Sequence, residues 1–380
     1  MMTQAIKVTK AVIEVLQIPE VKCEVKGHTG FISLNRPKAL NALSLPMIRA
    51  LTAQLLTWRT DSTIKQVAIR GMSKPAADGS DVPFGNFSAG GDIRFFHHAI
   101  QTGNPALEDF FTEEYALNHL IANYGKPYIA FMDGIIFGGG MGITQGASHR
   151  FVTERTKMAM PETGIGLFPD VGGGYFLSRC PGFVGEYLAL TGVQIGADEA
   201  IAYGLADVKV NSTDLAEIWE SLAMHEIQNI TINKIAAKSI NTPTTSEIDT
   251  YFSLYSVLEI IQALEPSNGS WAQQTVKTLH SRSPLMLHVV LEQIRRGRQL
   301  NLAQNLQMER GMIRHCFYTA HLQRFGSASE TVEGIRALAV DKDHMPRWNP
   351  PRLEDVTTDM VLPFFESPWP ENAHPLRHLS

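Results

Sequence analysis

The middle of the chain reads Met160-Pro-Glu-Thr-Gly-Ile-Gly-Leu-Phe-Pro-Asp-Val-Gly-Gly-Gly-Tyr175. This segment places two carboxylates, Glu162 and Asp170, eight positions apart. The glycines and the proline between the two acids disfavour a regular helix, so we expect both acids to project from turns. Turns at the ends of strands are where functional groups usually collect. We therefore take this segment as the centre of a candidate site.

A glycine cluster, Phe137-Gly-Gly-Gly-Met-Gly142, precedes the two acids. Because glycine lacks a Cβ, the N–H groups of such a cluster can approach a carbonyl oxygen closely and stabilise it as it becomes negative. A carboxylate can then activate water or move a proton. A tight turn with close backbone packing also explains the cluster taken alone. The chain contains neither the GxxxxGK[ST] nor the GxGxxG phosphate-binding fingerprint.

The chain has 380 residues, of which 44% are hydrophobic and 19% charged, as is typical of a globular protein with a sizeable core. Its net charge of −5 argues against nucleic acid as the main partner, because binding to the phosphate backbone requires a basic face. Three cysteines, Cys23, Cys180 and Cys316, show no metal-binding spacing and are expected to be reduced thiols. We expect no metal site.

Residues 1–21 contain no long apolar segment, so we expect neither a secretory signal nor a transit peptide there. The most apolar segment, residues 128–147, contains Asp133 and six glycines. This composition indicates a buried strand and turn rather than a membrane span. We therefore expect no membrane contact and a cytoplasmic location.

Short β-rich runs alternate with helical patterns in the first half of the chain. Strands are expected at residues 31–34, 66–70, 128–132 and 150–153, and helices at 45–60 and 109–124. This alternation predicts parallel crossover units and an α/β fold. Further helices are expected at residues 215–230, 246–264, 271–280, 284–296 and 302–322. We therefore place a boundary near residue 225, between a core at 1–225 and a helical C-terminal region at 226–380.

Four motifs carry a family resemblance. They are Ser88-Ala-Gly-Gly-Asp-Ile93, Gly134-Ile-Ile-Phe-Gly-Gly-Gly140, Met160-Pro-Glu162 and Asn35-Arg-Pro-Lys-Ala-Leu-Asn-Ala-Leu43. Together they resemble the crotonase (enoyl-CoA hydratase/isomerase) superfamily, in which the fourth motif is the coenzyme A loop. The resemblance covers residues 21–356 and implies a crotonase-like β-β-α spiral core, here with a helical C-terminal region.

Further motifs are similar to one subgroup of that superfamily, the 3-hydroxyisobutyryl-CoA hydrolases. They are Phe168-Pro-Asp-Val-Gly-Gly-Gly-Tyr-Phe176, Glu113-Glu-Tyr-Ala-Leu-Asn118, and Glu333-Gly-Ile-Arg-Ala337 followed by Asp341-Lys-Asp343. The resemblance implies four sets of site residues: catalytic Glu162 and Asp170; oxyanion-hole N–H groups of Gly91 and Gly139; substrate contacts from Glu114, Gly139, Glu162 and Asp170; and coenzyme A contacts from Arg36, Lys38, Ala39, Ala89 and Asp92.

Ordinary structural explanations remain open for several of these residues. Asp170 could be the N-cap of a helix that begins after it, and Glu114 alone reads as an exposed helix acid. Arg36 or Lys38 individually could belong to a charged surface turn. One departure matters more, because the hydratases carry a second glutamate two residues after the glycine triplet, where this chain has Gly142.

The resemblance implies a thioester hydrolase acting on a short 3-hydroxyacyl-CoA, with 3-hydroxyisobutyryl-CoA of valine breakdown as the expected substrate. Two alternatives stay open: an enoyl-CoA hydratase or isomerase, and a non-catalytic acyl-CoA-binding protein. No cofactor is expected, because coenzyme A enters as part of the substrate. The expected partner is this acyl-CoA, with no nucleic acid and no membrane, and the resemblance also admits a homo-oligomer built on trimers.

Overall fold

The computed structural model describes residues 18–232, 234–236 and 243–380. The chain divides into two compact units, each assembled from segments that are distant in the sequence. The first unit takes its described residues from 1–91, 116–158 and 195–238, and the second from 92–115, 159–194 and 239–380.

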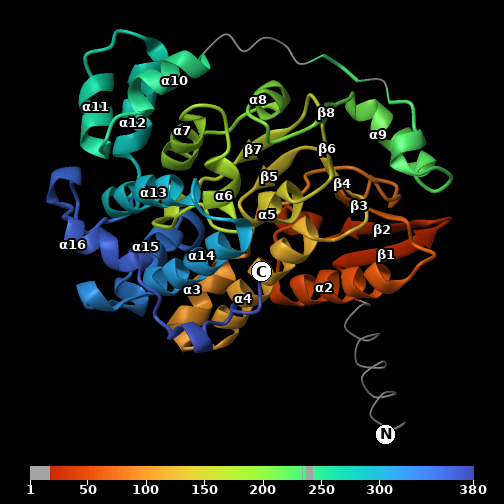
Figure 1. Cartoon of the computed structure of the whole chain (residues 1–380), viewed down its shortest axis with the longest axis horizontal. Helices are drawn as coiled ribbons and strands as arrows, with labels where there is room; N and C mark the ends of the chain where they lie inside the picture. The colour runs from red at the N-terminus through yellow and green to blue at the C-terminus, as the bar shows by residue number, and fades with distance from the viewer. Residues whose placement is uncertain (1–17, 233, 237–242) are drawn as a thin grey trace, which may run out of the picture. The chain divides into compact units, whose positions relative to one another are not determined.

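The first unit contains a six-stranded sheet of order β1-β2-β3-β4-β6-β8 (Figure 1). β1 and β2 pair antiparallel, and the pairs that follow are parallel. Parallel neighbours need a crossover connection, which α2 supplies between β2 and β3. The strands are β1 (Val21–Lys26), β2 (Thr29–Leu34), β3 (Gln66–Gly71), β4 (Tyr128–Met132), β6 (His149–Val152) and β8 (Val208–Lys209).

The remaining elements of this unit are short, apart from α2. β5 and β7 form a separate two-stranded sheet. The elements are α2 (Leu45–Thr60), β5 (Ile135–Phe137), α5 (Gly139–Gln145), β7 (Lys157–Ala159), α8 (Ala197–Ala202) and α9 (Leu215–Ser221). The strands and the helix expected between residues 31 and 153 in this unit all form, so the predicted α/β class is confirmed.

The core of the first unit lies on one face of the sheet. The strand register puts Phe131 of β4 beside Phe151 of β6, and Phe151 beside Val208 of β8. Side chains in such a row point to the same face. Trp219 of α9 covers this face, with its ring centroid 4.7 Å from that of Phe31 and 5.4 Å from that of Phe131. All of these side chains are buried in one hydrophobic cluster.

The second unit is mainly helical. α6 and α7 pack on α13, and α10 packs on α7, with α11 and α12 beside one another (Figure 1). The helices are α3 (Ile93–Thr102), the first part of α4 (Ala106–Ala122), η2 (Glu162–Ile165), α6 (Gly173–Leu177), α7 (Val184–Thr191), α10 (Thr245–Phe252), α11 (Val257–Leu264), α12 (Ser270–His280), α13 (Pro284–Gly297), α14 (Leu302–Phe317), α15 (Glu330–Ile335) and α16 (Thr358–Val361). Strands β9 (Tyr318–Thr319) and β10 (Arg324–Phe325) form a small hairpin.

Three predicted helices differ from the structure. The helix expected at 302–322 ends at Phe317, and strand β9 begins at Tyr318. The helix expected at residues 246–264 is two helices, because the Ser256 hydroxyl accepts from the Glu259 N–H and starts α11 anew. The helix expected at 215–230 ends at Ser221. Beyond it, the side chain of Gln66 in the sheet bonds to the His225 oxygen at 2.9 Å and to the Ile227 N–H at 2.8 Å, so tertiary hydrogen bonds replace helical ones.

The boundary expected near residue 225 also differs from the observed division. The described residues of segment 195–238 belong to the first unit, where β8 and α9 complete the sheet and its core. Residues 92–115 and 159–194 belong to the second unit, where α6 and α7 pack on the C-terminal helices. Among the described residues, none of the helices is both long and apolar enough to cross a membrane.

Trp219→Ala should lower the free energy of unfolding by about 3–5 kcal/mol, because it leaves a large cavity beneath the sheet. Urea unfolding followed by circular dichroism measures this change. Val25→Ala in β1 is the matched control, because Val25 is 51% exposed and should change stability by less than about 0.5 kcal/mol. Equal effects of the two substitutions would contradict the assignment of Trp219 to the core.

Candidate active site

Two loops of the first unit, residues 88–91 and 137–140, lie against each other. A backbone hydrogen bond of 2.9 Å joins them. A Cβ at Gly90 would lie 3.2 Å from the Gly139 nitrogen and 3.0 Å from a backbone oxygen of the other loop. Gly90 also has φ +94°, a conformation that favours glycine. Glycine therefore permits this close approach of the two backbones.

The predicted oxyanion donors, Gly91 and Gly139, belong to these two adjoining loops. Within the described residues, neither N–H group donates to another group of the protein. Gly139 is the first residue of α5, and Gly138 before it has φ +46°. Both N–H groups can therefore donate to an acceptor that does not belong to the chain.

Asn41 joins the predicted coenzyme A loop, residues 35–43, to neighbouring segments of the chain. This side chain is fully buried and donates to the backbone oxygens of Met72 at 3.0 Å and Asn86 at 2.8 Å. The Ser88 hydroxyl in turn donates to the Asn41 oxygen at 2.9 Å. Asn41 has φ +55°, and asparagine is one of the residues that tolerate this conformation. The structural role of Asn41 was not predicted from the sequence, where an asparagine within a turn was the available signal.

The structure brings four of the predicted coenzyme A contacts together. Arg36 is half-buried, and its Nη1 donates to a backbone oxygen of its own loop at 3.0 Å. Lys38 is exposed and Ala39 half-buried in a short 3₁₀ turn. The Ala89 N–H donates to the Leu40 oxygen at 2.9 Å, which joins Ala89 to this loop. Their contact with coenzyme A stays a prediction.

Asp92, the fifth predicted coenzyme A contact, has a structural role in the second unit. It is the N-cap of α3, and its side chain accepts from the Phe95 N–H at 3.4 Å. Such a cap satisfies one of the N–H groups that the first turn of a helix leaves free. Binding of coenzyme A by Asp92 stays a prediction.

Three predicted site acids, Glu114, Glu162 and Asp170, are buried in the second unit. Their exposed fractions are 2%, 7% and 6%. Glu114 is therefore not an exposed helix acid. Glu114 Oε1 and Glu162 Oε2 are buried without a hydrogen-bond partner in the described protein. Buried polar atoms normally have partners, so these two oxygens mark a place where a substrate group could bind.

Burial is the largest cause of a raised pKa in all three acids. It raises the pKa of Asp170 to about 6. The pKa of Glu162 is raised well above its usual range by burial and by the charge of Asp170. The pKa of Glu114 is raised by burial and then by the charges of the other two acids. The three acids therefore form an electrostatically linked cluster that loses its protons stepwise.

Tyr115 is a member of this cluster that the sequence analysis missed. Its side chain is fully buried, and its hydroxyl donates to Asp170 Oδ2 at 2.7 Å. This hydrogen bond favours the ionised form of Asp170 and opposes the effect of burial on its pKa. Tyr115 directly follows Glu114 in the motif at residues 113–118, but only Glu114 of this motif was predicted as a site residue.

A left-handed turn presents Asp170. The two residues that follow it, Val171 and Gly172, have φ +55° and +89°. This conformation is rare for a β-branched residue such as valine. α6 begins at Gly173 with Gly172 as its N-cap, and no side chain caps it from that position. The structure therefore does not support the explanation that Asp170 is a helix N-cap.

Glu162 begins the 3₁₀ turn η2, so it projects from a turn as expected. Residues from later in the second unit hold this turn. The Ser283 N–H donates to the Thr163 oxygen at 3.2 Å. The Thr331 hydroxyl donates to the Gly166 oxygen at 2.7 Å. Hydrogen bonds to the backbone oxygens of Thr163 and Gly166 therefore fix the turn, and the Glu162 side chain takes no part in them.

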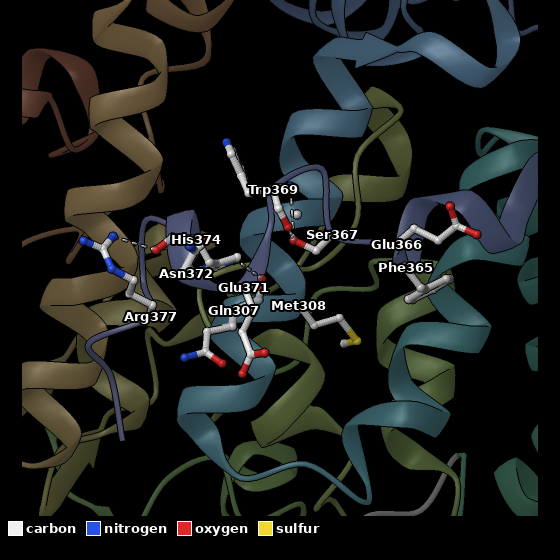
Figure 2. Close-up of a pocket in the computed structure, with 11 residues that line it drawn as sticks. Gln307, Met308, Phe365, Glu366, Ser367, Trp369, Glu371, Asn372, His374 and Arg377 are labelled. Carbon is white, nitrogen blue, oxygen red and sulfur yellow. Dashed lines mark hydrogen bonds between the residues drawn. The ribbon is translucent and has the colours of Figure 1, made fainter.

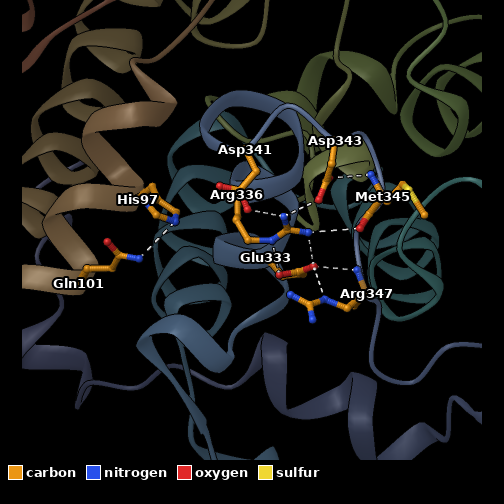
Figure 3. Close-up of polar contacts among 8 residues, drawn as sticks. All are labelled: His97, Gln101, Glu333, Arg336, Asp341, Asp343, Met345 and Arg347. Carbon is orange, nitrogen blue, oxygen red and sulfur yellow. Dashed lines mark hydrogen bonds and ion pairs between the residues drawn. The ribbon is translucent and has the colours of Figure 1, made fainter.

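The motif at residues 333–343 forms an ion-pair cluster around Arg336 (Figure 3). Its guanidinium group pairs with three carboxylates at 2.6–2.8 Å. His97 and Gln101 of α3 line a hollow of about 370 Å³ beside it. Because Arg336 is fully engaged, this motif stabilises the fold of the second unit.

A larger pocket of about 800 Å³ lies between α14 and the C-terminal segment (Figure 2). None of the predicted site residues lines it. The pocket is therefore distinct from the acid cluster in the same unit. Its lining residues are Gln307, Met308, Gly311, Phe365, Glu366, Ser367, Trp369, Glu371, Asn372, His374 and Arg377.

The glycine N–H groups and the buried acids are suited to two different chemical tasks. The first unit offers N–H donors on glycine loops, which suit an oxygen that becomes negative. The second unit offers buried acids whose different affinities for protons suit acid–base catalysis. Among the described residues, no group of three or more His, Cys, Asp or Glu side chains could hold a metal ion.

The fold and these groups place the chain in a known class. The sequence model of the enoyl-CoA hydratase/isomerase family matches residues 29–365, and the chain belongs to this family. The crystal structure of an enoyl-CoA hydratase from Rhodobacter sphaeroides 2.4.1 has a TM-score of 0.81 and 34% sequence identity. The match covers 91% of this chain and 97% of that chain. The predicted crotonase-type fold is thereby confirmed.

Two relatives narrow the comparison within the family. The chain is 38% identical over 354 residues to "3-hydroxyisobutyryl-CoA hydrolase, mitochondrial" of Xenopus tropicalis, covering 90% of this chain and 87% of the relative. It is 37% identical over 369 residues to "3-hydroxyisobutyryl-CoA hydrolase 1" of Arabidopsis thaliana, covering 93% of each. The resemblance to this subgroup, predicted from the motifs, is confirmed.

Asp170→Asn should raise the free energy of unfolding at pH 8, because a buried carboxylate with a raised pKa destabilises the folded state once it is ionised. The pKa rises from 3.8 to about 6, so the gain can reach about 3 kcal/mol. The gain should be fully present above about pH 6 and should disappear as the pH falls towards 3.8. Urea unfolding at pH 4, 6 and 8 measures it, and a loss of stability at pH 8 would contradict the electrostatic description.

Proposed function

We propose that this chain hydrolyses the thioester of a short 3-hydroxyacyl-CoA. The proposed substrate is 3-hydroxyisobutyryl-CoA, and the products are 3-hydroxyisobutyrate and coenzyme A, in valine catabolism. The observation that carries this proposal is the buried, linked set of Glu114, Glu162 and Asp170, in a chain related over at least 90% of its length to hydrolases of that name.

The Gly91 and Gly139 N–H groups would bind the thioester carbonyl oxygen. Donors that are already in place when the oxygen becomes negative lower the barrier by roughly 3–4 kcal/mol each. The hydrogen bonds of Asn41 and Ser88 support this role, because they hold the backbone of the adjoining loops in one conformation. The Arg36–Ala39 turn would bind the nucleotide end of coenzyme A.

Glu162 would act on the carbonyl carbon in one of two ways. As a general base it takes a proton from water while the water oxygen bonds to that carbon. As a nucleophile it bonds to the carbon itself, and water then hydrolyses the anhydride. In both cases the C–S bond breaks and coenzyme A leaves as a thiolate. In the first route the thiolate takes up the proton that Glu162 removed from water. In the second route hydrolysis of the anhydride by water regenerates the Glu162 carboxylate and releases the proton that the thiolate takes up. Asp170 would orient the water or Glu162. Once Glu162 is ionised, its raised pKa makes the carboxylate more basic, which favours either role.

One acid of the cluster would bind the 3-hydroxyl group of the substrate. Glu114 fits this role, because its pKa is raised well above its usual range and one of its oxygens lacks a partner in the described protein. A protonated carboxyl group can both donate and accept a hydrogen bond. Asp170 is the other candidate, with one oxygen already bound to Tyr115.

A hydratase is the alternative from the same family, and one similar solved structure is described as an enoyl-CoA hydratase. Gly142 disfavours this function, because a second acid is missing where the hydratases are expected to carry one. The two functions separate in one experiment with crotonyl-CoA and 3-hydroxyisobutyryl-CoA. Faster hydration of the first than thiol release from the second would support the hydratase.

A cytoplasmic location and a homo-oligomer both stay predictions. The name of the Xenopus relative includes the word mitochondrial, which does not agree with the first of these, whereas the Arabidopsis name gives no location. Cell fractionation and light scattering test the two predictions directly.

Glu162→Ala should lower kcat by at least about a hundredfold, the scale of acid–base catalysis. KM should change little, because the glycine N–H groups and the coenzyme A loop are untouched. Thiol release from 3-hydroxyisobutyryl-CoA measures both constants. Near-normal turnover by a folded Glu162→Ala protein would contradict the mechanism.

The substrate hydroxyl should matter for catalysis. A buried acid that loses its partner is penalised by about 1–3 kcal/mol, which predicts a preference of roughly ten- to several-hundredfold for 3-hydroxyisobutyryl-CoA over isobutyryl-CoA in kcat/KM. Glu114→Gln should reduce this ratio more than Asp170→Asn if Glu114 binds the hydroxyl. Equal rates on the two thioesters would leave a short-chain thioesterase without this specificity.

A further inference from the structure

Glu309 of α14 is a fully buried acid that the proposed mechanism does not use. Its carboxylate accepts four hydrogen bonds. At Oε2 it accepts from the Gly172 N–H at 2.7 Å. At Oε1 it accepts from the Gly174 N–H at 2.9 Å, from Asn305 at 2.7 Å and from Gln293 at 3.2 Å.

These donors surround the turn that carries Asp170. Gly172 and Gly174 follow Asp170 in the sequence, and Gln293 reaches the residue before it, because its Nε2 also donates to the Pro169 oxygen at 2.7 Å. Glu309 thus holds the chain on both sides of Asp170, directly on one side and through Gln293 on the other. It also satisfies N–H groups at the start of α6, the role that the sequence analysis had considered for Asp170.

The glycines after Asp170 make this arrangement possible. A Cβ at Gly174 would lie 2.6 Å from Asn305 Oδ1 and 3.2 Å from Glu309 Oε1. A Cβ at Gly297 of α13 would lie 2.1 Å from the Gly174 oxygen. Glycine at these positions lets α13 and α14 approach the turn closely enough for Glu309 and Gln293 to bond to its backbone.

We propose that Glu309 is a positioning residue for the reaction, because it fixes the left-handed turn that presents Asp170. The inference rests on the proposed function, in which Asp170 is catalytic. Val171 keeps its rare conformation only where its surroundings determine it, and Glu309 provides the contacts that do so. Glutamine at position 309 would keep only one acceptor oxygen. Its NH₂ group would replace the other oxygen and would point at N–H donors, with which it cannot form hydrogen bonds.

The test is Glu309→Gln in the full-length chain. We expect kcat for 3-hydroxyisobutyryl-CoA to fall about ten- to a hundredfold, because small displacements of a reacting group are costly. KM should stay within about twofold, because no group that binds substrate is changed. Amide hydrogen exchange followed by mass spectrometry should show at least about tenfold faster exchange in peptides that span residues 168–177.

Glu186→Gln is the matched control. Glu186 is also fully buried in the second unit, and both of its oxygens accept from Arg298, at 2.6 and 2.7 Å. This substitution should lower Tm yet leave kcat and the exchange of residues 168–177 unchanged. Gln293→Met is the second variant, used if Glu309→Gln does not fold. It removes the bonds of Gln293 to the Pro169 oxygen and to Glu309 and leaves the bonds from Glu309 to the glycine N–H groups, so kcat should fall about three- to tenfold.

Three outcomes would overturn the inference: normal kcat in folded Glu309→Gln, a loss of kcat without faster exchange at residues 168–177, or an equal loss of kcat in Glu186→Gln. The proposed function fails differently. If the unsubstituted enzyme releases no thiol from any acyl-CoA, the function is wrong. Exchange at residues 168–177 in Glu309→Gln then still decides whether Glu309 fixes the turn.

Discussion

The second unit has to keep several carboxylates in a dry interior without neutralising them with cations. Glu114, Glu162, Asp170 and Glu309 are all buried, and none of the ion pairs among the described residues includes them. Hydrogen-bond donors take the place of counter-charges, and they are distributed unequally. Asp170 accepts a hydrogen bond from the Tyr115 hydroxyl, whereas one oxygen of Glu114 accepts no hydrogen bond from the described protein. The Tyr115 hydroxyl lowers the pKa of Asp170 against the effect of burial, whereas burial and the neighbouring charges both raise the pKa of Glu114.

The first unit meets a complementary requirement with backbone groups alone. An N–H group stabilises a developing negative charge only if it is held in place beforehand, because reorganisation during the reaction would cost what the interaction gains. Asn41 and Ser88 provide this rigidity through hydrogen bonds to neighbouring backbone. Gly90 allows the loops to touch. The residues that we propose as catalytic and the residues that support them are therefore different, and only the proposed catalytic residues stood out in the motifs.

The sequence predicted those parts of the molecule that local pattern determines. The helix at residues 45–60 and the strands of the parallel sheet form as expected, because their periodicity and length are unambiguous. The break before Ser256 carried a signal in its capping serine, which the apolar pattern on both sides obscured. Tyr115 and Glu309 could not be found in this way, since they contact the Asp170 turn from 55 and 137 residues away. A local sequence pattern cannot predict contacts between residues that are so far apart in the chain.

If Asp170 is the second acid of the proposed reaction, its position explains why the chain needs its C-terminal helices. In the hydratase pattern that acid would stand at residue 142, on the helix that begins with the glycine cluster. Here Gly142 occupies that place, and Asp170 belongs instead to a left-handed turn. A turn has no regular ladder of hydrogen bonds to hold it, so its geometry must come from elsewhere. α13 and α14 supply it through Gln293 and Glu309. Gly172 and Gly174 therefore act together with Asp170. Without the hydrogen bonds from their N–H groups to Glu309, the backbone would not hold the Asp170 side chain in one orientation.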